Sequence, residues 1–206
     1  MSKYLNLDTF RNQPVQREPY PWHVQPEFVK PETLDNVIES YPKVSKPGSF
    51  PLPGLKFGGA FAELIKELEG PEVRQAFQEK FETDLTNRPT MITARGMCRA
   101  RDGAVHTDSR TKIITVLIYL NRTWGNEGGC LRLLRSPSMD DCITEVAPSA
   151  GTLISFLNTE NAWHGHASYE GPRQVIQLNW VTDTGVVKYE QRRHRFSAFL
   201  KKLNPF

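Results

Sequence analysis

The sequence has few cysteines and no long hydrophobic run, and each absence excludes a class of protein. Three cysteines occur, and their spacings fit no zinc or redox motif. No apolar stretch reaches the roughly 18 residues that a membrane span needs. The N-terminal residues lack the apolar core of a secretory signal. Sparse cysteines in an odd number predict reduced thiols. We therefore expect a cytoplasmic protein with no membrane partner.

Charge of one sign is also scarce. The formal net charge is +3, which is too small to argue for binding to nucleic acid. Apolar residues make up 38% of the chain and charged residues 24%, as in ordinary globular proteins. With 206 residues the chain is long enough for a domain with its own core. We predict a single domain over residues 1–206, and the sequence leaves its oligomeric state open.

The first half of the chain predicts a helical support over residues 20–90. The expected elements are a short strand within 20–29, a helix that starts at Pro31, a loop at 42–59 and two helices within 60–81. Proline in a first turn favours a helix start at Pro31, and Gly70-Pro71 divides the later helical pattern. Residues 1–19 are polar and are expected to be loose.

From about residue 91 the sequence changes to short runs rich in β-branched and aromatic residues. The expected strands are 91–101, 112–120, 130–135, 142–147, 151–158, 164–169 and 173–182. Gly, Pro, Asn or Asp interrupt most of the gaps between them. The pattern predicts a mainly β fold, a sandwich or jelly roll over residues 91–185. A C-terminal helix is predicted within 186–206, because the apolar residues there fall on one helical face.

A histidine and an aspartate two positions apart are the first candidates for chemistry. In an extended segment, residues i and i+2 face the same side, so His106 and Asp108 can reach one metal ion. A later histidine, His164 or His166, would complete a two-histidine, one-carboxylate triad. That triad occupies one face of an octahedral iron and leaves positions for a bidentate 2-oxo acid and O2. Taken alone, a His-x-Asp pair is more often part of a polar loop.

Two predicted strands carry residues suited to binding an anion. Arg173 begins an otherwise apolar strand, and a buried guanidinium needs an anionic partner such as the distal carboxylate of 2-oxoglutarate. An arginine at the rim, in a turn, gives the same pattern. Tyr119 and Thr115 share one strand face with Leu117 and Ile113. Their hydroxyls either line a polar pocket, or Tyr119 is a core residue with its hydroxyl at the edge.

The segment from His106 to about Asp183 resembles the prolyl 4-hydroxylase-like branch of the Fe(II)/2-oxoglutarate-dependent dioxygenases, in particular its small stand-alone bacterial-type members. The matching pieces are His106-Thr-Asp108, Val116-Leu-Ile-Tyr119-Leu-Asn121, Gly128-Gly129-Cys-Leu131-Arg-Leu133, Pro148-Ser-Ala-Gly151-Thr-Leu-Ile-Ser-Phe156, His164, Gly171-Pro-Arg173 and the strand ending in Trp180. Their order and gaps match, whereas the preceding residues match only loosely. The resemblance implies a double-stranded β-helix (jelly-roll, cupin-like) core with iron near one open end.

The resemblance also implies the metal ligands. In this family the distal histidine precedes the co-substrate arginine or lysine by about nine or ten positions. His164 lies nine positions before Arg173, whereas His166 lies seven positions before it. The implied Fe(II) ligands, which are also the implied catalytic residues, are therefore His106, Asp108 and His164. His166 is then expected to contact the substrate or to support a ligand.

Further roles implied by the resemblance concern 2-oxoglutarate. Arg173 is expected to pair with its distal carboxylate, and Tyr119 is expected to share that carboxylate. Thr115 lies near by on the same strand, and Leu131 falls where the family packs an apolar residue against the co-substrate.

The sequence departs from the family at the end of the last strand. Asn179 stands where close relatives often have a tryptophan, which here comes one place later as Trp180. This difference implies either a one-residue shift or a different pocket wall. Nucleic-acid demethylases of the wider superfamily carry a second arginine six residues after the first, where this chain has Asn179. We therefore expect no nucleic-acid substrate.

The implied reaction is hydroxylation of an unactivated C–H bond in a small-molecule or peptidyl substrate. Fe(II), 2-oxoglutarate and O2 are required, succinate and CO2 are the co-products, and ascorbate is expected to support turnover. The carboxylate at Asp108 favours hydroxylation, because related halogenases have a small residue there. The alternative is a sensor module of the same fold that binds iron and 2-oxoglutarate without turnover.

The substrate itself is not named by these residues. Four arginines flank the expected mouth of the site, and they are either contacts for an acidic or phosphorylated substrate or solvated loop charges: Arg99, Arg101, Arg110 and Arg122. Trp124 and its loop, residues 121–129, are expected to line the site for either a free metabolite or a peptidyl proline.

Overall fold

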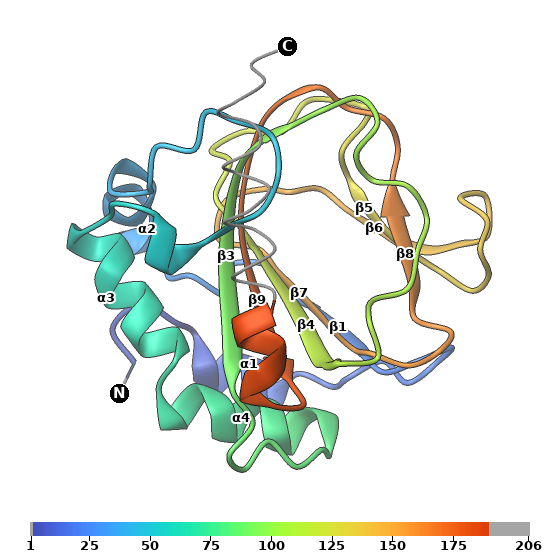
Figure 1. Ribbon diagram of the computed structural model, residues 1–206, viewed down its shortest axis with the longest axis horizontal. Helices are drawn as coiled ribbons and strands as arrows, with labels where there is room; N and C mark the ends of the chain where they lie inside the picture. The colour runs from blue at the N-terminus through green and yellow to red at the C-terminus, as the bar shows by residue number, and fades with distance from the viewer. Residues whose placement is uncertain (1, 190–206) are drawn as a thin grey trace.

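The computed structural model describes residues 2–189, in which helices flank two antiparallel sheets (Figure 1). The helices are α1 (Leu7–Asn12), α2 (Pro31–Glu39), α3 (Gly59–Leu68) and α4 (Pro71–Phe81), with a 3-10 turn, η1, at Leu52–Gly54. The strands are β1 (Trp22–Gln25), β2 (Phe50–Pro51), β3 (Thr90–Cys98), β4 (Lys112–Tyr119), β5 (Leu131–Leu134), β6 (Cys142–Val146), β7 (Leu153–Leu157), β8 (Trp163–His166) and β9 (Gly171–Val181).

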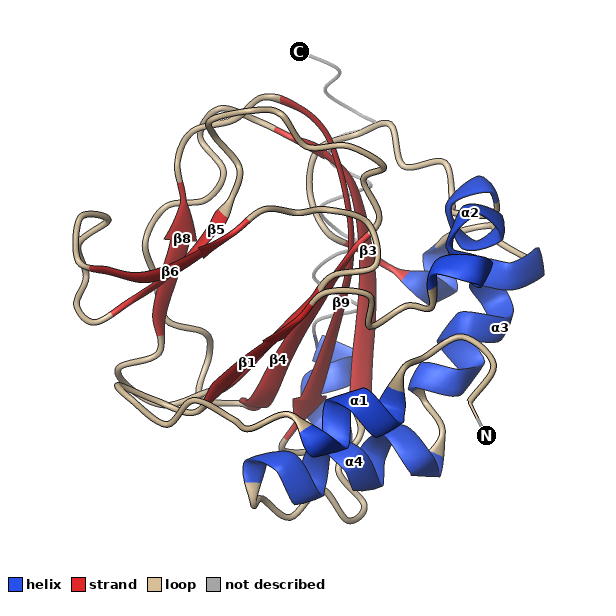
Figure 2. Ribbon diagram, turned by 180° about the vertical axis from the view of Figure 1, so that it is seen from behind, coloured by secondary structure: helices blue, strands red, loops and turns tan. Residues whose placement is uncertain are grey.

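The strands form one large and one small sheet. The larger has six strands in the order β1-β7-β4-β9-β3-β2, and the smaller has three in the order β6-β5-β8. Helices α1 to α4 cover the outer face of the larger sheet, and the smaller sheet lies on its other side (Figure 2). This arrangement is the predicted double-stranded β-helix. The seven strands expected after residue 91 are all present, with ends shifted by a few residues.

Each face of the larger sheet packs against its own hydrophobic core. Ile114, Val116 and Ile118 of β4 point toward the helices, whereas Tyr119 belongs to a second core between the two sheets. Trp180 lies on the helix side, with its ring 4.9 Å from that of Phe77. The space between the sheets is thereby left for the polar residues of β4 and β9.

The predicted face of β4 is correct for three of its four residues. Thr115, Leu117 and Tyr119 face the space between the sheets, but Ile113 packs against the helix-side core. The reason is a shift in the β4–β9 register between Lys112 and Ile114, which breaks the two-residue alternation.

The prediction that residues 1–19 are loose was wrong. This stretch contains α1, with Leu7 and Phe10 fully packed in the helix-side core, and its backbone bridges pair Leu5 with Val29. A few apolar residues on one helical face were enough for tertiary burial to outweigh the polar composition. The predicted loop at 42–59 also contains β2 and η1.

At the other end, residues 184–189 are helical, and the rest of the predicted C-terminal helix lies outside the described residues. Within residues 2–189, no helix is long and apolar enough to cross a membrane.

We predict that Phe10→Ala destabilises the protein by about 3–5 kcal/mol, because a fully buried aromatic ring would leave a cavity. The Phe10 ring lies 4.5 Å from that of Phe77 and 5.6 Å from that of Phe28. Urea unfolding followed by circular dichroism measures the change. Asn12→Ala, at the exposed end of α1, is the matched control and should stay within about 0.5 kcal/mol. Equal stability of Phe10→Ala and Asn12→Ala would contradict the packing of α1.

Candidate metal and co-substrate site

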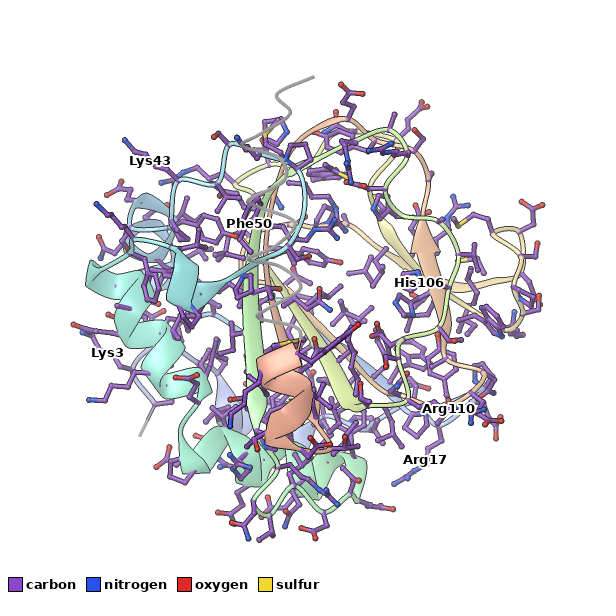
Figure 3. The ribbon with its side chains drawn as sticks, viewed as in Figure 1. Lys3, Arg17, Lys43, Phe50, His106 and Arg110 are labelled. Carbon is purple, nitrogen blue, oxygen red and sulfur yellow. The ribbon has the colours of Figure 1, made fainter. Side chains whose placement is uncertain are left out.

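Three potential metal ligands converge between the sheets. Ligand atoms of His106, Asp108 and His164 all lie within 4.8 Å of one another. His106 sits in the long β3–β4 connection and pairs with His164 on β8 through two backbone hydrogen bonds of 3.0 Å each. Figure 3 shows His106 in the region between β8 and the larger sheet. The spacing of two positions between His106 and Asp108 then brings the carboxylate to the same place.

Both histidines present the ring nitrogen that a metal needs. Each Nδ1 lies against a backbone carbonyl, Ala104 O at 2.8 Å for His106 and Ala162 O at 2.9 Å for His164. A carbonyl only accepts, so Nδ1 carries the proton and Nε2 keeps a free lone pair. Burial lowers the pKa of His164 to about 4, so its imidazole is neutral at pH 7.

Asp108 is held in place by two donors. Lys112 Nζ and Thr115 Oγ1 each lie 2.5 Å from one of its carboxylate oxygens. Burial opposes ionisation, but the positive charge of Lys112 and these hydrogen bonds keep the pKa of Asp108 below its usual value. Thr115 in turn accepts a hydrogen bond from Asn179 Nδ2 at 2.9 Å. Lys112 was not among the predicted site residues, although its position four residues after Asp108 was a usable signal.

Asn179 therefore has a place in the site that strand alternation explains. It points into the space between the sheets and is 1% exposed, whereas its neighbour Trp180 points to the helices. The β4–β9 register is continuous from Ile114 to Tyr119, so Asn179 rather than Trp180 faces the space between the sheets. The choice between a shift and a different pocket wall relative to the family stays a prediction.

The second histidine of β8 lies apart from the metal cluster. His164 and His166 share one face of the strand, with Gly165 between them. His166 Nδ1 faces its neighbour's carbonyl, Ala167 O, at 2.9 Å, and its Nε2 lies 3.9 Å from Cys98 Sγ. The geometry thus brings His164, rather than His166, to His106 and Asp108.

Arg173 is a buried cation without a counter-ion among residues 2–189. Its side chain is 4% exposed, its Nε donates to Gly129 O at 2.9 Å, and its Nη2 lies 3.5 Å from the Tyr119 hydroxyl. No carboxylate in the described part of the chain forms an ion pair with it. Burial raises the pKa of Tyr119, which keeps the hydroxyl protonated. Leu131 packs in the same core as Tyr119. An uncompensated buried guanidinium fits a ligand carboxylate.

The arginines expected at the mouth mostly have acidic partners. Arg99 pairs with Asp102 at 2.9 Å, and Arg110 pairs with Glu160 at 2.8 Å with both side chains more than 80% exposed. Arg122 pairs with Asp35 and Glu39 of α2, and Arg101 is exposed. Figure 3 shows Arg110 at the periphery of the molecule. Of the two alternatives for these arginines, substrate contacts or solvated loop charges, the ion pairs favour solvated loop charges.

Trp124 contributes to the loop after β4. Its ring centroid lies 4.7 Å from that of Tyr169, and its indole N–H donates to Gly128 O at 3.3 Å. Gly129 has φ +79°, and a Cβ there would meet the Trp124 ring at 2.7 Å. A glycine is required so that this loop can turn and offer its carbonyl to Arg173.

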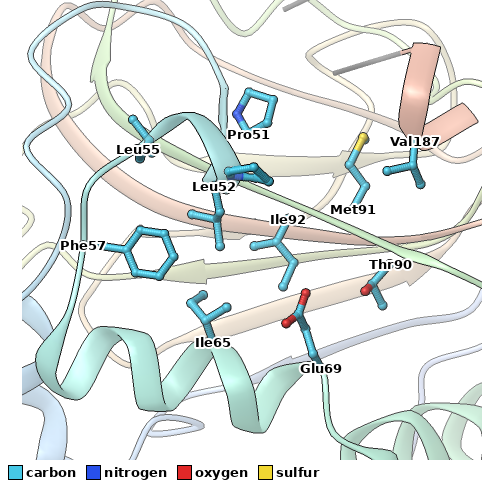
Figure 4. Close-up of a pocket in the computed structure, with 11 residues that line it drawn as sticks. Pro51, Leu52, Leu55, Phe57, Ile65, Glu69, Thr90, Met91, Ile92 and Val187 are labelled. Atoms are coloured by element: carbon cyan, nitrogen blue, oxygen red, sulfur yellow. The ribbon is translucent and has the colours of Figure 1, made fainter. Parts of the chain in front are cut away.

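One cavity lies beside the ligand cluster, and another lies away from it. One of about 300 Å³ is lined by Asp108, Arg110 and Glu160 with neighbouring polar residues. The other, of about 340 Å³, lies between α3, η1 and the start of β3 and holds none of the predicted site residues (Figure 4). Its walls are apolar except for Thr90 and Glu69, and burial raises the pKa of Glu69. Solvent thus reaches the Asp108 side of the candidate metal centre.

Residues 96–182 match the family model of the 2OG-Fe(II) oxygenase superfamily. The matched segment includes the three converging ligands and Arg173. A comparison with curated proteins found no match to this chain.

Solved structures with the same fold are prolyl hydroxylases and related oxygenases. A Pseudomonas putida prolyl-4-hydroxylase is 17% identical, with a TM-score of 0.58, and the match covers 79% of this chain and 92% of that one. The viral collagen prolyl hydroxylase of Paramecium Bursaria Chlorella virus-1, in a 2OG complex, is 15% identical with a TM-score of 0.53, covering 78% and 96%. A 2OG-Fe(II) oxygenase family oxidoreductase from Burkholderia pseudomallei is 13% identical with a TM-score of 0.54, covering 85% and 90%.

The fold and the matched segment define a class of protein, a double-stranded β-helix of the type that 2-oxoglutarate oxygenases have. Residues 96–182 match the 2OG-Fe(II) oxygenase superfamily, as the predicted family and enzyme class require, and the solved prolyl hydroxylases share the fold of this chain. The individual residue roles remain predictions.

We predict that His164→Ala lowers Mn(II) affinity by at least about 100-fold, because loss of a direct ligand exceeds the 10–100-fold cost of losing a supporting residue. His166→Ala should change that affinity by less than about tenfold. Calorimetric titration of both variants under nitrogen measures the difference. The reverse ranking, with metal lost only in His166→Ala, would assign the ligand to His166.

Proposed function

We propose that this protein uses Fe(II) and 2-oxoglutarate to hydroxylate an unactivated C–H bond. The observation that carries the proposal is the pairing of two features in one interior: three converging ligand atoms and the buried, uncompensated Arg173. The buried Arg173 guanidinium costs free energy without an anionic partner, and a bound dicarboxylate would offset that cost.

The donor set suits ferrous iron. Two imidazoles and one carboxylate would occupy one face of an octahedral Fe(II) ion and would leave three positions for co-substrate and O2. Fe(II) held by these residues would supply the oxidising chemistry, in which 2-oxoglutarate and O2 would give succinate and CO2 and the second oxygen atom would enter the substrate.

The chain keeps the metal ligands ready for binding. Lys112 and Thr115 occupy one oxygen lone pair each on Asp108, which fixes the carboxylate plane and keeps it ionised. The Phe156 ring, 4.7 Å from that of His164, excludes water from one side of the site. These residues determine which ligand atoms face the metal before it arrives.

Arg173 and Tyr119 are suited to bind the far carboxylate of 2-oxoglutarate. The Tyr119 hydroxyl and the Arg173 guanidinium are adjacent donors, and Leu131 offers an apolar wall. Thr115 at the metal end and Tyr119 at this end are four residues apart on β4, about 13 Å along a strand. The co-substrate and the long Arg173 side chain together span that distance.

The proposed substrate is a small molecule or a peptidyl residue, and the proposal includes no nucleic-acid substrate. Prolyl hydroxylases of the same fold support a hydroxylase-type reaction, and the carboxylate of Asp108 favours hydroxylation over halogenation. O2 is a required co-substrate in this proposal, with ascorbate supporting turnover by keeping the iron ferrous.

The direct test is release of succinate from 2-oxoglutarate by the Fe(II)-loaded protein in air, with ascorbate and fractionated metabolite extracts. We expect succinate release that an extract fraction stimulates and that Asp108→Ala reduces at least about 100-fold. A wild-type protein that binds both Fe(II) and 2-oxoglutarate but releases no succinate with any fraction would instead be a sensor module.

We also predict that Arg173→Ala weakens 2-oxoglutarate binding by about 10- to 100-fold, because a charge-assisted hydrogen-bonded pair is lost. Metal affinity should stay within the error of the titration. Arg132→Ala is the control, because Arg132 pairs with Glu145 on the smaller sheet between the inward-facing Leu131 and Leu133. Unchanged affinity for 2-oxoglutarate in Arg173→Ala would remove this residue from the proposed role.

A further inference from the structure

A second arginine faces the same interior as Arg173. Along β3, Ile92 and Ala94 pack in the helix-side core, so alternation turns Thr93 and Arg95 toward the space between the sheets. Arg95 is directly opposite Val175 of β9, which belongs to the core on that inner side. Sequence reasoning missed Arg95, because it belongs to no family motif.

Arg95 has an incomplete set of partners. Its Nη2 lies 3.7 Å from Asp102 Oδ2, and its guanidinium makes no hydrogen bond to any of residues 2–189. Asp102 is instead engaged by Arg99, through Nη2 at 2.9 Å, Nε at 3.3 Å and the backbone N–H at 3.0 Å. Burial and the nearby charge of Arg173 both lower the pKa of Arg95.

The charges of this corner do not balance. Three arginines, Arg95, Arg99 and Arg173, lie in this corner with one carboxylate, Asp102, which pairs with Arg95 and Arg99 only. The far carboxylate of 2-oxoglutarate would neutralise Arg173, and Asp102 neutralises one of the other two arginines. One positive charge would then remain without a partner. Arg95 is the group that carries it, because Arg99 already has the closer contacts to Asp102.

The two inward-facing arginines, Arg95 and Arg173, differ in how much of their side chain solvent can reach. The Arg95 side chain is 26% exposed, whereas Arg173 is 4% exposed. A ligand that arrives after 2-oxoglutarate can therefore still reach Arg95 from solvent. Arg95 is therefore accessible to a substrate that binds after 2-oxoglutarate.

We propose that Arg95 binds the carboxylate of the substrate, which is then a small organic acid. This inference rests on the proposed function, because it assigns the second anion to the same interior. A monocarboxylate fits better than a phosphate, since one free guanidinium beside the Asp102 carboxylate would meet a dianion with too few donors and with repulsion.

A polar wall leads from Arg95 toward the candidate metal centre. Thr93 pairs with Gln177 across β3 and β9, Gln177 donates to Asn179 at 3.3 Å, and Asn179 donates to Thr115 beside Asp108. Arg95 pairs with Val175, which lies four residues before Asn179 on β9. The distance along the strand between these two levels is about 13 Å. A small acid held at Arg95 would thus extend its carbon chain along this wall toward the metal.

The experiment uses the full chain loaded with Zn(II), a redox-inert stand-in for Fe(II), and 2-oxoglutarate. Propionate is the probe, and its neutral isostere propionamide is the control ligand, both followed by saturation-transfer NMR. We expect saturable binding of propionate and none of propionamide. Arg95→Gln should weaken propionate at least about fivefold, as expected for a lost charge-assisted pair.

The matched control is Arg132→Gln. Arg132 is also on a strand, also beside one acid and 29% exposed, but it points away from the space between the sheets. It should bind propionate like the wild type. Arg95→Gln leaves Asp102 paired with Arg99, so the variant keeps its fold, and Arg95→Lys should restore part of the binding.

Separate titrations with 2-oxoglutarate distinguish the two proposals. Arg95→Gln should change 2-oxoglutarate affinity by less than about threefold, and Arg173→Gln by at least about tenfold. Equal losses in both variants would make Arg95 part of the co-substrate pocket and overturn the inference. So would propionate binding that is absent from the loaded wild type or survives in Arg95→Gln. If the Zn(II)-loaded wild type binds no 2-oxoglutarate, the proposed function itself fails.

Discussion

The backbone pairing of His106 with His164 is the constraint on which the candidate site depends. These residues are far apart in the sequence, and two hydrogen bonds of 3.0 Å join the long β3–β4 connection to the smaller sheet. The pairing fixes both Cα positions, and the carbonyls of Ala104 and Ala162 then fix both ring tautomers. Asp108 follows two positions later in the same connection, where Lys112 and Thr115 hold its carboxylate. The candidate metal ligands therefore come together only when the β3–β4 connection pairs with β8 of the smaller sheet.

The space between the sheets holds more positive than negative side chains at the end away from the metal ligands. At the metal end, Asp108 is balanced by Lys112. At the other end, Asp102 faces Arg95 and Arg99 while Arg173 has no acid among residues 2–189. Buried cations without partners are costly, and such sites are retained where a ligand supplies the missing charge. The interior is therefore suited to anionic ligands as well as to a metal.

The fold was largely predictable because its signals are local. Pro31 and Gly70-Pro71 mark helix limits, and alternating apolar residues mark the strands. The His-x-Asp pair and the isolated Arg173 were visible for the same reason. The burial of Phe10 was not, because it depends on tertiary contacts with Phe28 and Phe77.

The choice between His164 and His166 also lay beyond strand periodicity. Both face the same side of β8, and only the long-range partners, His106 for one and Cys98 for the other, tell them apart. The same holds for Arg95, whose meaning comes from Asp102 and Arg173 rather than from its sequence neighbours. Residue types and spacing predicted the chemistry, whereas charge balance required the three-dimensional structure.

We propose that one interior binds both metal and co-substrate, between the histidine pair and Arg173. The decisive measurement is a crystal structure of the protein grown without oxygen, with Fe(II) and 2-oxoglutarate. We expect iron bound by His106 Nε2, a carboxylate oxygen of Asp108 and His164 Nε2. We also expect the far carboxylate of 2-oxoglutarate to lie on Arg173 and the Tyr119 hydroxyl. Iron bound by His166 in place of His164, or 2-oxoglutarate bound away from Arg173, would show that the proposal is wrong.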